Sequence, residues 1–226
     1  YFIEDVKGLI LDVAHASNRN VTETMPLFTE KKLHPASISE VMEQRLKVAK
    51  NYSEKLKYRD NWFDINIISG DTIIYHPDGR IKVNLDSLVL RGLNSNSDIY
   101  CNSGIELELD SFDEIDGEEF TKEQVEKYTC RSFSKLEDII KNPIWIALVR
   151  GNTELLTEYV HKFHNFESQR FMELLISYSD RMPVIETPLC FESGYDGSQL
   201  QGYVSDHKLK GESSSFMIGV KNKIER

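Results

Sequence analysis

The stretch that decides the fold class is Phe63–Leu90, FDINIISGDTIIYHPDGRIKVNLDSLVL. Its runs FDINIIS and DTIIYH are alternating or apolar, which is typical of strands, and a Ser-Gly pair separates them. HPDGR supplies the Pro, Asp and Gly of a tight turn before a further strand pattern, RIKVNLDSLVL. The short runs DIYC and GIELELD follow. Together these runs predict an antiparallel meander of about four or five strands.

Helical patterns precede this β region. Residues 2–16 carry apolar side chains near helical spacing, which predicts a helix. Residues 17–36 contain two prolines and are expected to be irregular. A capping box formed by Ser37 and Glu40 then predicts the start of a helix that continues to about Tyr58.

A second helical region and a second β region follow the meander. Helix formers dominate from Lys122 to Ser179, and after Met182 the runs VIETPLCFES, QLQGYVSD and SSSFMIGVK are β-like. The sequence therefore predicts an α+β fold with N-terminal helices, an antiparallel β meander, a helical segment with an αα-hairpin, and a C-terminal β portion. We expect one domain over residues 1–226, with sub-regions at 1–60 (helical), 61–121 (β meander), 122–180 (helical) and 181–226 (β).

The αα-hairpin is expected at residues 142–163, NPIWIALVRGNTELLTEYVHKF. Pro143 suits the first position of a helix, Gly151 suits the turn, and the small side chain of Ala147 permits close helix contact. This stretch resembles the helix-turn-helix core of an ankyrin repeat. Because the pattern does not recur at the ankyrin period, the resemblance implies a single repeat-like hairpin. We expect Trp145 and Leu156 to be buried within it.

Composition describes an ordinary globular protein. The chain has 226 residues, 40% hydrophobic and 28% charged, so it can bury a substantial core without disulfides or metal. No stretch has the apolar length of a membrane span. We expect no signal peptide in the opening residues, whose apolar run is too short and too charged for one. Three widely spaced cysteines, Cys101, Cys130 and Cys190, favour free thiols and a soluble, intracellular protein, and we expect a cytoplasmic location.

The negative charge is concentrated in one segment. The net charge is −10, and no Lys or Arg lies between Arg91 and Lys122. That interval holds nine acids, which leaves 28 acids (37 minus 9) against 27 bases in the rest of the chain. Nucleic-acid binding is therefore not expected, since phosphate contacts need a basic face. A solvated acidic strand and turn, a metal or cationic-ligand site, and a docking surface for a basic protein all remain open.

The metal alternative rests on Glu106, Asp110, Asp113 and Asp116. The Asp-Gly pair at 116–117 looks like part of a calcium loop. The EF-hand frame, however, would place Phe112 at the first ligand position, where it offers no oxygen. A divalent-metal hydrolase using carboxylates in 106–118 is accordingly the alternative hypothesis.

Motifs of other chemistries are missing from the sequence. There is no GxSxG elbow, Walker loop, GxGxxG or HExxH, so no catalytic residue and no cofactor is indicated. The preferred hypothesis is a non-catalytic interaction or assembly protein whose acidic patch contacts a partner with a basic surface. The sequence does not indicate an oligomeric state.

Overall fold

A computed structural model describes the greater part of the chain. The described residues are 13–17, 21–50, 66–99, 104–129, 132–133, 136–163, 171–176, 183–194, 197–202 and 216–221. Within these residues no helix is both long and apolar enough to cross a membrane. Cys190 forms no disulfide with any described residue, whereas Cys101 and Cys130 lie outside the described residues.

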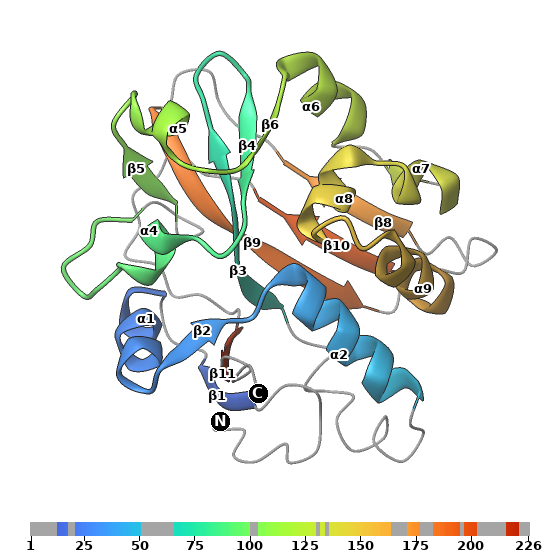
Figure 1. Ribbon diagram of the computed structural model, residues 1–226, viewed down its shortest axis with the longest axis horizontal. Coiled ribbons are helices and arrows are strands. Elements are labelled where there is room, and N and C mark those ends of the chain that lie inside the picture. Colours follow the sequence, from blue (N-terminus) through green and yellow to red (C-terminus); the bar gives the residue numbers. More distant parts are fainter. Residues whose placement is uncertain are drawn as a thin grey trace.

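A mixed β-sheet organises the molecule (Figure 1). Its main strand order is β1-β11-β3-β9-β10-β8-β7. The strands on this path are β1 (Val13–Ser17), β11 (Phe216–Lys221), β3 (Ile67–Tyr75), β9 (Val184–Gly194), β10 (Gly197–Gln201), β8 (Phe171–Leu175) and β7 (Ser132–Phe133). Shorter strands join its sides: β2 (Leu33–Pro35) pairs with β11, β4 (Ile81–Asn84) with β3, β5 (Ile105–Leu107) with β9, and β6 (Glu118–Phe120) with β4.

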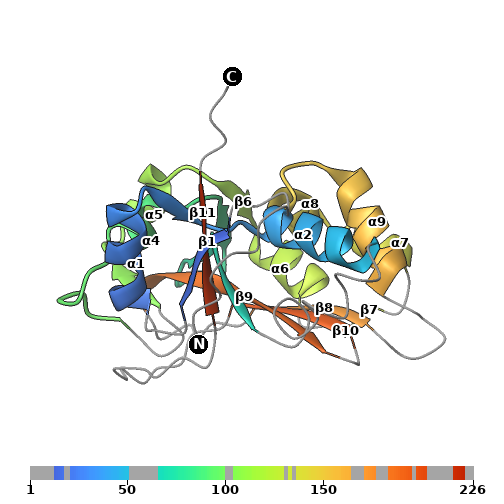
Figure 2. The same ribbon diagram turned by 90° about the horizontal axis from the view of Figure 1, so that it is seen from below.

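The helices form two groups. One group is α2 (Ile38–Lys50), α6 (Lys122–Tyr128), α7 (Leu136–Ile140), α8 (Pro143–Leu148) and α9 (Thr153–Phe163). The other is α1 (Val21–Glu30), α4 (Leu88–Arg91) and α5 (Ser111–Glu114). Figures 1 and 2 show these groups on opposite sides of the strands β3 and β11.

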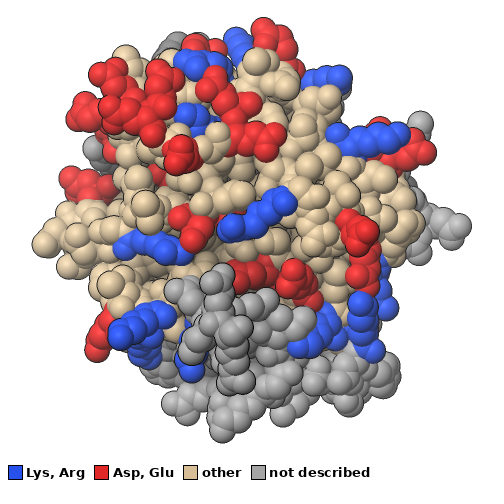
Figure 3. Space-filling model, viewed as in Figure 1, with Lys and Arg blue, Asp and Glu red and all other residues tan. Residues whose placement is uncertain are grey.

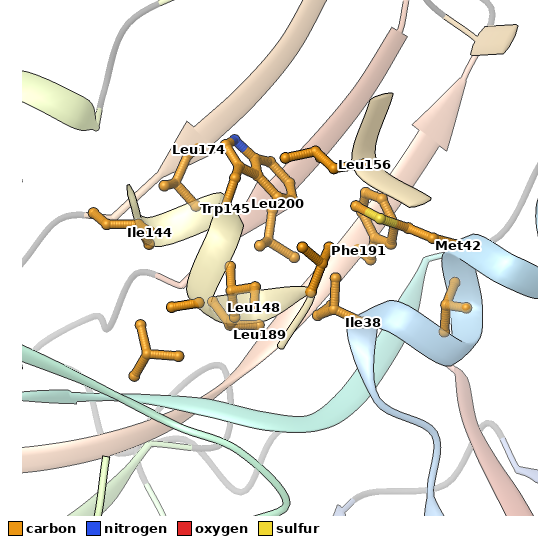
Figure 4. Close-up of a cluster of buried hydrophobic side chains, with 14 of the residues drawn as sticks. Ile38, Met42, Ile144, Trp145, Leu148, Leu156, Leu174, Leu189, Phe191 and Leu200 are labelled. Atoms are coloured by element: carbon orange, nitrogen blue, oxygen red, sulfur yellow. The ribbon is translucent and has the colours of Figure 1, made fainter. Parts of the chain in front are cut away.

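Strand β3 is buried on both of its faces, to which neighbouring residues of a strand point in turn. On β3, Ile73 and Tyr75 face the main core, while Ile74 faces a smaller cluster with Phe112 and Val184. On β11, Met217 belongs to a third cluster under α1 and α4. Around Trp145 and Phe191 the main core gathers apolar side chains from α2, α8 and α9 and from the strands β8, β9 and β10 (Figure 4).

The α+β class and the αα-hairpin are confirmed. Helices α8 and α9 are joined by a turn at Gly151, whose φ is 77°, and Asn142 caps α8 by accepting from two backbone N–H groups. Trp145 and Leu156 are both 0% exposed. The capping box of α2 is also present, since Glu40 N–H donates to Ser37 Oγ and Ser37 N–H donates to Glu40. The part of that predicted helix at 51–58 lies outside the described residues.

The N-terminal prediction was wrong in two places. Residues 13–17 form strand β1, which pairs antiparallel with β11, instead of the end of a helix. The stretch expected to be irregular contains α1 and β2. In α1, Val21, Met25 and Phe28 recur at helical spacing and are buried, and this burial outweighs the cost of Pro26 inside the helix.

The sheet also differs from a sequential meander. The two apolar runs around Ser69 form the single strand β3, whose irregularity is a register shift against β9. The predicted strand at 80–90 ends at Asn84, because Ser87 caps a new helix, α4. Strands β7 and β8 lie within the segment expected to be helical, and β8 pairs parallel with β10. These strands are stabilised by pairing with segments distant in the sequence. The local pattern of apolar residues contains no information about such pairing.

Candidate functional site

The acidic segment folds over the sheet as a small lobe made of β5, α5 and β6. Figure 3 shows Asp and Glu side chains gathered over these elements, at the upper left of the view. We define the acidic patch as the exposed carboxylates of this lobe: Glu106, Glu108, Asp110, Asp113, Glu114, Asp116, Glu118 and Glu119.

The apolar side of the lobe fixes it to the sheet. Phe112, on α5, is fully buried and packs with Ile74 and Val184. Ile105 is also buried, and Leu107 is half-buried. The run GIELELD alternates apolar and acidic residues as a strand with one buried face would. Leu109 is nevertheless 59% exposed, because β5 ends at Leu107 and the chain turns into α5.

Two basic side chains contact the inner side of the lobe: Lys82 from β4, and Arg80 from the turn before β4. Lys82 is buried, and its Nζ donates to the carbonyl oxygens of Phe112 and Ile115. It therefore satisfies carbonyls at the end of α5, as a cation at a helix C-terminus should. The Lys82 ammonium and the Arg80 guanidinium lie 4.7 and 5.0 Å from the centre of the Phe112 ring.

Arg80 also neutralises part of the patch. Its guanidinium contacts Asp78 and Glu119, each at 2.8 Å, and lies 3.9 Å from Asp113. Hydrogen bonds to Glu119 and Asp78 raise the pKa of Arg80. Burial acts to raise the pKa of Asp78, but hydrogen bonds from Arg80 and His76 outweigh it and lower that pKa to about 2. The turn HPDGR thus reverses the chain direction and also supplies Arg80, whose guanidinium pairs with Glu119 of the lobe.

The outer carboxylates are not neutralised in this way. Within the part of the chain that the structure describes, Glu108, Asp110, Glu114, Asp116 and Glu118 form no ion pair. Their negative charge therefore faces solvent on a lobe whose inner side is fixed.

The four residues of the metal hypothesis lie on different pieces of the lobe. Glu106 is on β5, Asp110 precedes α5, Asp113 is within α5, and Asp116 follows it. Among the described residues, no group of three or more His, Cys, Asp or Glu side chains has an arrangement that could hold a metal ion. The metal-dependent hydrolase stays a hypothesis with no such group to support it.

A buried polar group lies on the sheet face that the lobe helps to cover. Glu186 of β9 is fully buried, and its Oε1 accepts hydrogen bonds from Thr72 Oγ1 at 2.5 Å and Asn84 Nδ2 at 3.0 Å. Because Glu186 is inaccessible, it adds nothing to the exposed patch.

Sequence reasoning located the patch but missed its anchors. Lys82 and Phe112 carry no motif, and their roles depend on the pairing of β4 with β6, which places Lys82 opposite Glu119. The available signals were the absence of bases between 91 and 122 and the one basic residue inside the strand pattern IKVN.

Comparison with known proteins gives one informative match. No protein-family model and no curated protein matches the chain. A solved structure described as "Accommodation of massive sequence variation in Nanoarchaeota by the C-type lectin fold" matches with a TM-score of 0.62 and 12% identity. The match covers 96% of this chain and 100% of the other chain. At this level of identity the likeness concerns the fold alone, and this chain therefore has a C-type lectin fold.

Proposed function

We propose that this protein is a non-catalytic binding protein and that the acidic patch is its contact surface for a protein partner with a basic surface. The observation that carries the proposal is the contrast between the two sides of the lobe. Its inner side is fixed by Phe112, Lys82 and Arg80. Its outer side presents five exposed carboxylates that form no ion pair with any described residue: Glu108, Asp110, Glu114, Asp116 and Glu118.

The fold is compatible with such a role. The solved structure that shares it is described as accommodating massive sequence variation, so in that protein the framework persists while the sequence changes. A framework of this kind suits a protein whose surface carries recognition. In this chain the acidic patch lies in the interval between Arg91 and Lys122, which holds nine acids and no Lys or Arg.

Electrostatics would govern how such a partner binds. A surface of one sign steers a partner of opposite sign and raises the association rate, and this effect declines as salt screens the charges. Each exposed charge pair contributes only about 0.2–1 kcal/mol, so several carboxylates must act together to give measurable affinity.

The test measures the affinity of the protein for a labelled lysine-rich peptide by fluorescence anisotropy, with a glutamate-rich peptide of the same length as reference. The patch variant carries Glu108→Gln, Asp110→Asn, Glu114→Gln and Asp116→Asn. Its matched control carries Glu30→Gln, Glu126→Gln, Asp138→Asn and Glu154→Gln, which are exposed positions outside the lobe. Both sets change the net charge from −10 to −6 (−10 + 4).

We expect the patch variant to lose roughly tenfold in affinity at low salt, because four contributing charges are removed. The control should lose much less. Equal losses in the two variants would mean that only net charge matters, and would contradict the assignment of binding to the patch.

A further inference from the structure

A second group of charged side chains lies away from the acidic patch. We define the charged cluster as six residues from separate segments of the chain: His34, Glu40, Asp71, Asp86, Arg91 and Arg150. Figure 3 shows Lys and Arg side chains on both sides of Asp and Glu side chains in the middle of the view, between α4 and the start of α2.

Asp71, at the centre of the cluster, is fully buried. Its Oδ2 accepts from the backbone N–H of Ile38 at 2.7 Å, and its Oδ1 accepts from the backbone N–H of Asp86 at 3.2 Å. Burial raises the pKa of Asp71 to about 6, against the lowering effects of the Ile38 hydrogen bond and the Arg150 charge. Both oxygens of this carboxylate are thus already used.

The other two carboxylates of the cluster are also occupied. Glu40 accepts from Ser37 N–H at 2.9 Å and lies 3.3 Å from His34 Nε2. Asp86 is paired with Arg91. The three carboxylates of the cluster therefore already interact with donors within the protein.

Some nitrogens of the basic side chains in the cluster have no hydrogen-bond partner among the described residues. The nearest carboxylate oxygen to Arg150 Nη2 is on Asp71 at 3.9 Å, too far for a hydrogen bond, and the Arg150 side chain is 50% exposed. The Arg150 guanidinium makes no hydrogen bond to any residue that the structure describes. Arg91 Nε and His34 Nδ1 are buried and likewise have no hydrogen-bond partner among those residues.

The backbone holds Arg150 in this place at a cost. Its φ is 55°, in the left-handed region that suits glycine, and Gly151 follows with a φ of 77°. Asp86, whose backbone N–H donates to the same Asp71 oxygen that Arg150 approaches, has a φ of 62°. Two residues of the cluster are thus kept in sparsely populated conformations, which occur preferentially at ligand-contacting sites.

We propose that the charged cluster is a binding site for a small oxyanion, a phosphate or carboxylate group, that accepts hydrogen bonds from the exposed guanidinium of Arg150. Arginine offers several N–H donors in a planar fork that matches both groups. The carboxylates of Asp71, Asp86 and Glu40 oppose the ligand, whereas His34 and the two arginines favour it. Affinity should therefore rise as the pH falls through about 6 and Asp71 becomes neutral.

The test is a titration with inorganic phosphate, and separately with acetate, at constant ionic strength set by chloride and followed by NMR. We expect saturable shifts of amides near Arg150 with at least one of the two ligands. The ligand whose shifts saturate at the lower concentration identifies the site as one for phosphate or for carboxylate groups. If the shifts are absent or stay linear in concentration for both ligands, the association is only weak and general, and the proposal is overturned.

The decisive variant is Arg150→Gly. Glycine adopts the local φ without strain, so this variant should melt at the wild-type temperature or higher, yet bind the oxyanion about tenfold more weakly because a charge-assisted hydrogen bond is lost. Arg150→Gln keeps a side chain at this position and should lose binding equally. Lys141→Gln, which changes an exposed lysine directly after α7, is the control for general charge. Unchanged oxyanion affinity in both Arg150 variants would overturn the proposal, whatever the acidic patch binds.

Discussion

Gly117 returns the chain from α5 to the sheet at a point where a side chain does not fit. A Cβ at this position would lie 2.6 Å from the carbonyl oxygen of Val83 and 2.7 Å from Lys82 Cγ. The close approach allows Glu118 to pair with Val83 at the start of β6. One residue without a side chain thus fixes where the acidic lobe meets β4.

Gly117→Ala should lower the free energy of unfolding by roughly 1–3 kcal/mol, because backbone atoms must move to admit the methyl group. Gly92→Ala is the matched control. Gly92 has a φ of −78° and its nearest such contact is at 3.4 Å, so this change should be within about 0.5 kcal/mol of neutral. Urea unfolding of both variants measures the difference, and equal values would refute the close-packing argument.

The buried carboxylate of Asp71 predicts a pH dependence of stability. Its pKa is about 6 in the folded protein and near 3.8 when exposed, so the folded state binds this proton more tightly. The free energy of unfolding should therefore fall as the pH rises from about 4 to about 6, by about 3 kcal/mol from this group. Above about pH 6 its contribution is constant.

Asp71→Asn removes that titration while keeping a similar shape. The variant should lack this decline, so its stability relative to the wild type should increase between pH 4 and pH 7. Denaturant unfolding at these two pH values provides the measurement. If the two proteins showed the same change with pH, Asp71 would not have the shifted pKa described here.

At the scale of elements, the hairpin α8–α9 shows what a sequence can predict. Its signals are local: Asn142 caps the helix, Pro143 opens it and Gly151 turns the chain. The strand β8 shows the opposite case, because its pairing with β10 joins segments separated by a long stretch of chain. The lobe lies between these cases, since its acids are visible in the sequence but its anchor Lys82 depends on sheet register.

Trp145→Ala should cost roughly 3–5 kcal/mol of the free energy of unfolding. The indole is fully buried between the hairpin and the sheet, with Phe191 6.3 Å away between ring centres (Figure 4). Glu154→Ala, at an exposed position of α9, should change stability by less than about 0.5 kcal/mol. A loss below about 1 kcal/mol for the tryptophan variant would contradict its place in the core.

At the scale of the whole molecule, the sheet joins the two ends of the chain. β1 and β2 from the N-terminal region both pair with β11 from the C-terminal region, and β9 lies between β3 and β10. Composition and periodicity predicted the α+β class, but they contain no information on which strands are neighbours. The C-type lectin fold was therefore recognised only when the structure was compared with a solved structure.

The whole protein should gain little stability from calcium. With a Kd of about 10 µM, about 1 mM Ca²⁺ would add roughly 2.7 kcal/mol and raise the melting temperature by about 5–10 °C. We expect a rise of less than about 2 °C at fixed ionic strength, since the patch carboxylates lie on separate pieces of the lobe. A larger rise that Asp113→Ala or Asp116→Ala abolished would favour the metal hypothesis.

In the proposed function, a partner with a basic surface contacts the acidic patch. The most direct measurement is an NMR titration of the isotope-labelled protein with the lysine-rich peptide. We expect the amides shifted most at low salt to belong to residues 106–119, and the shifts to decrease as salt is added. Shifts concentrated on another face, or scattered over the surface, would contradict it.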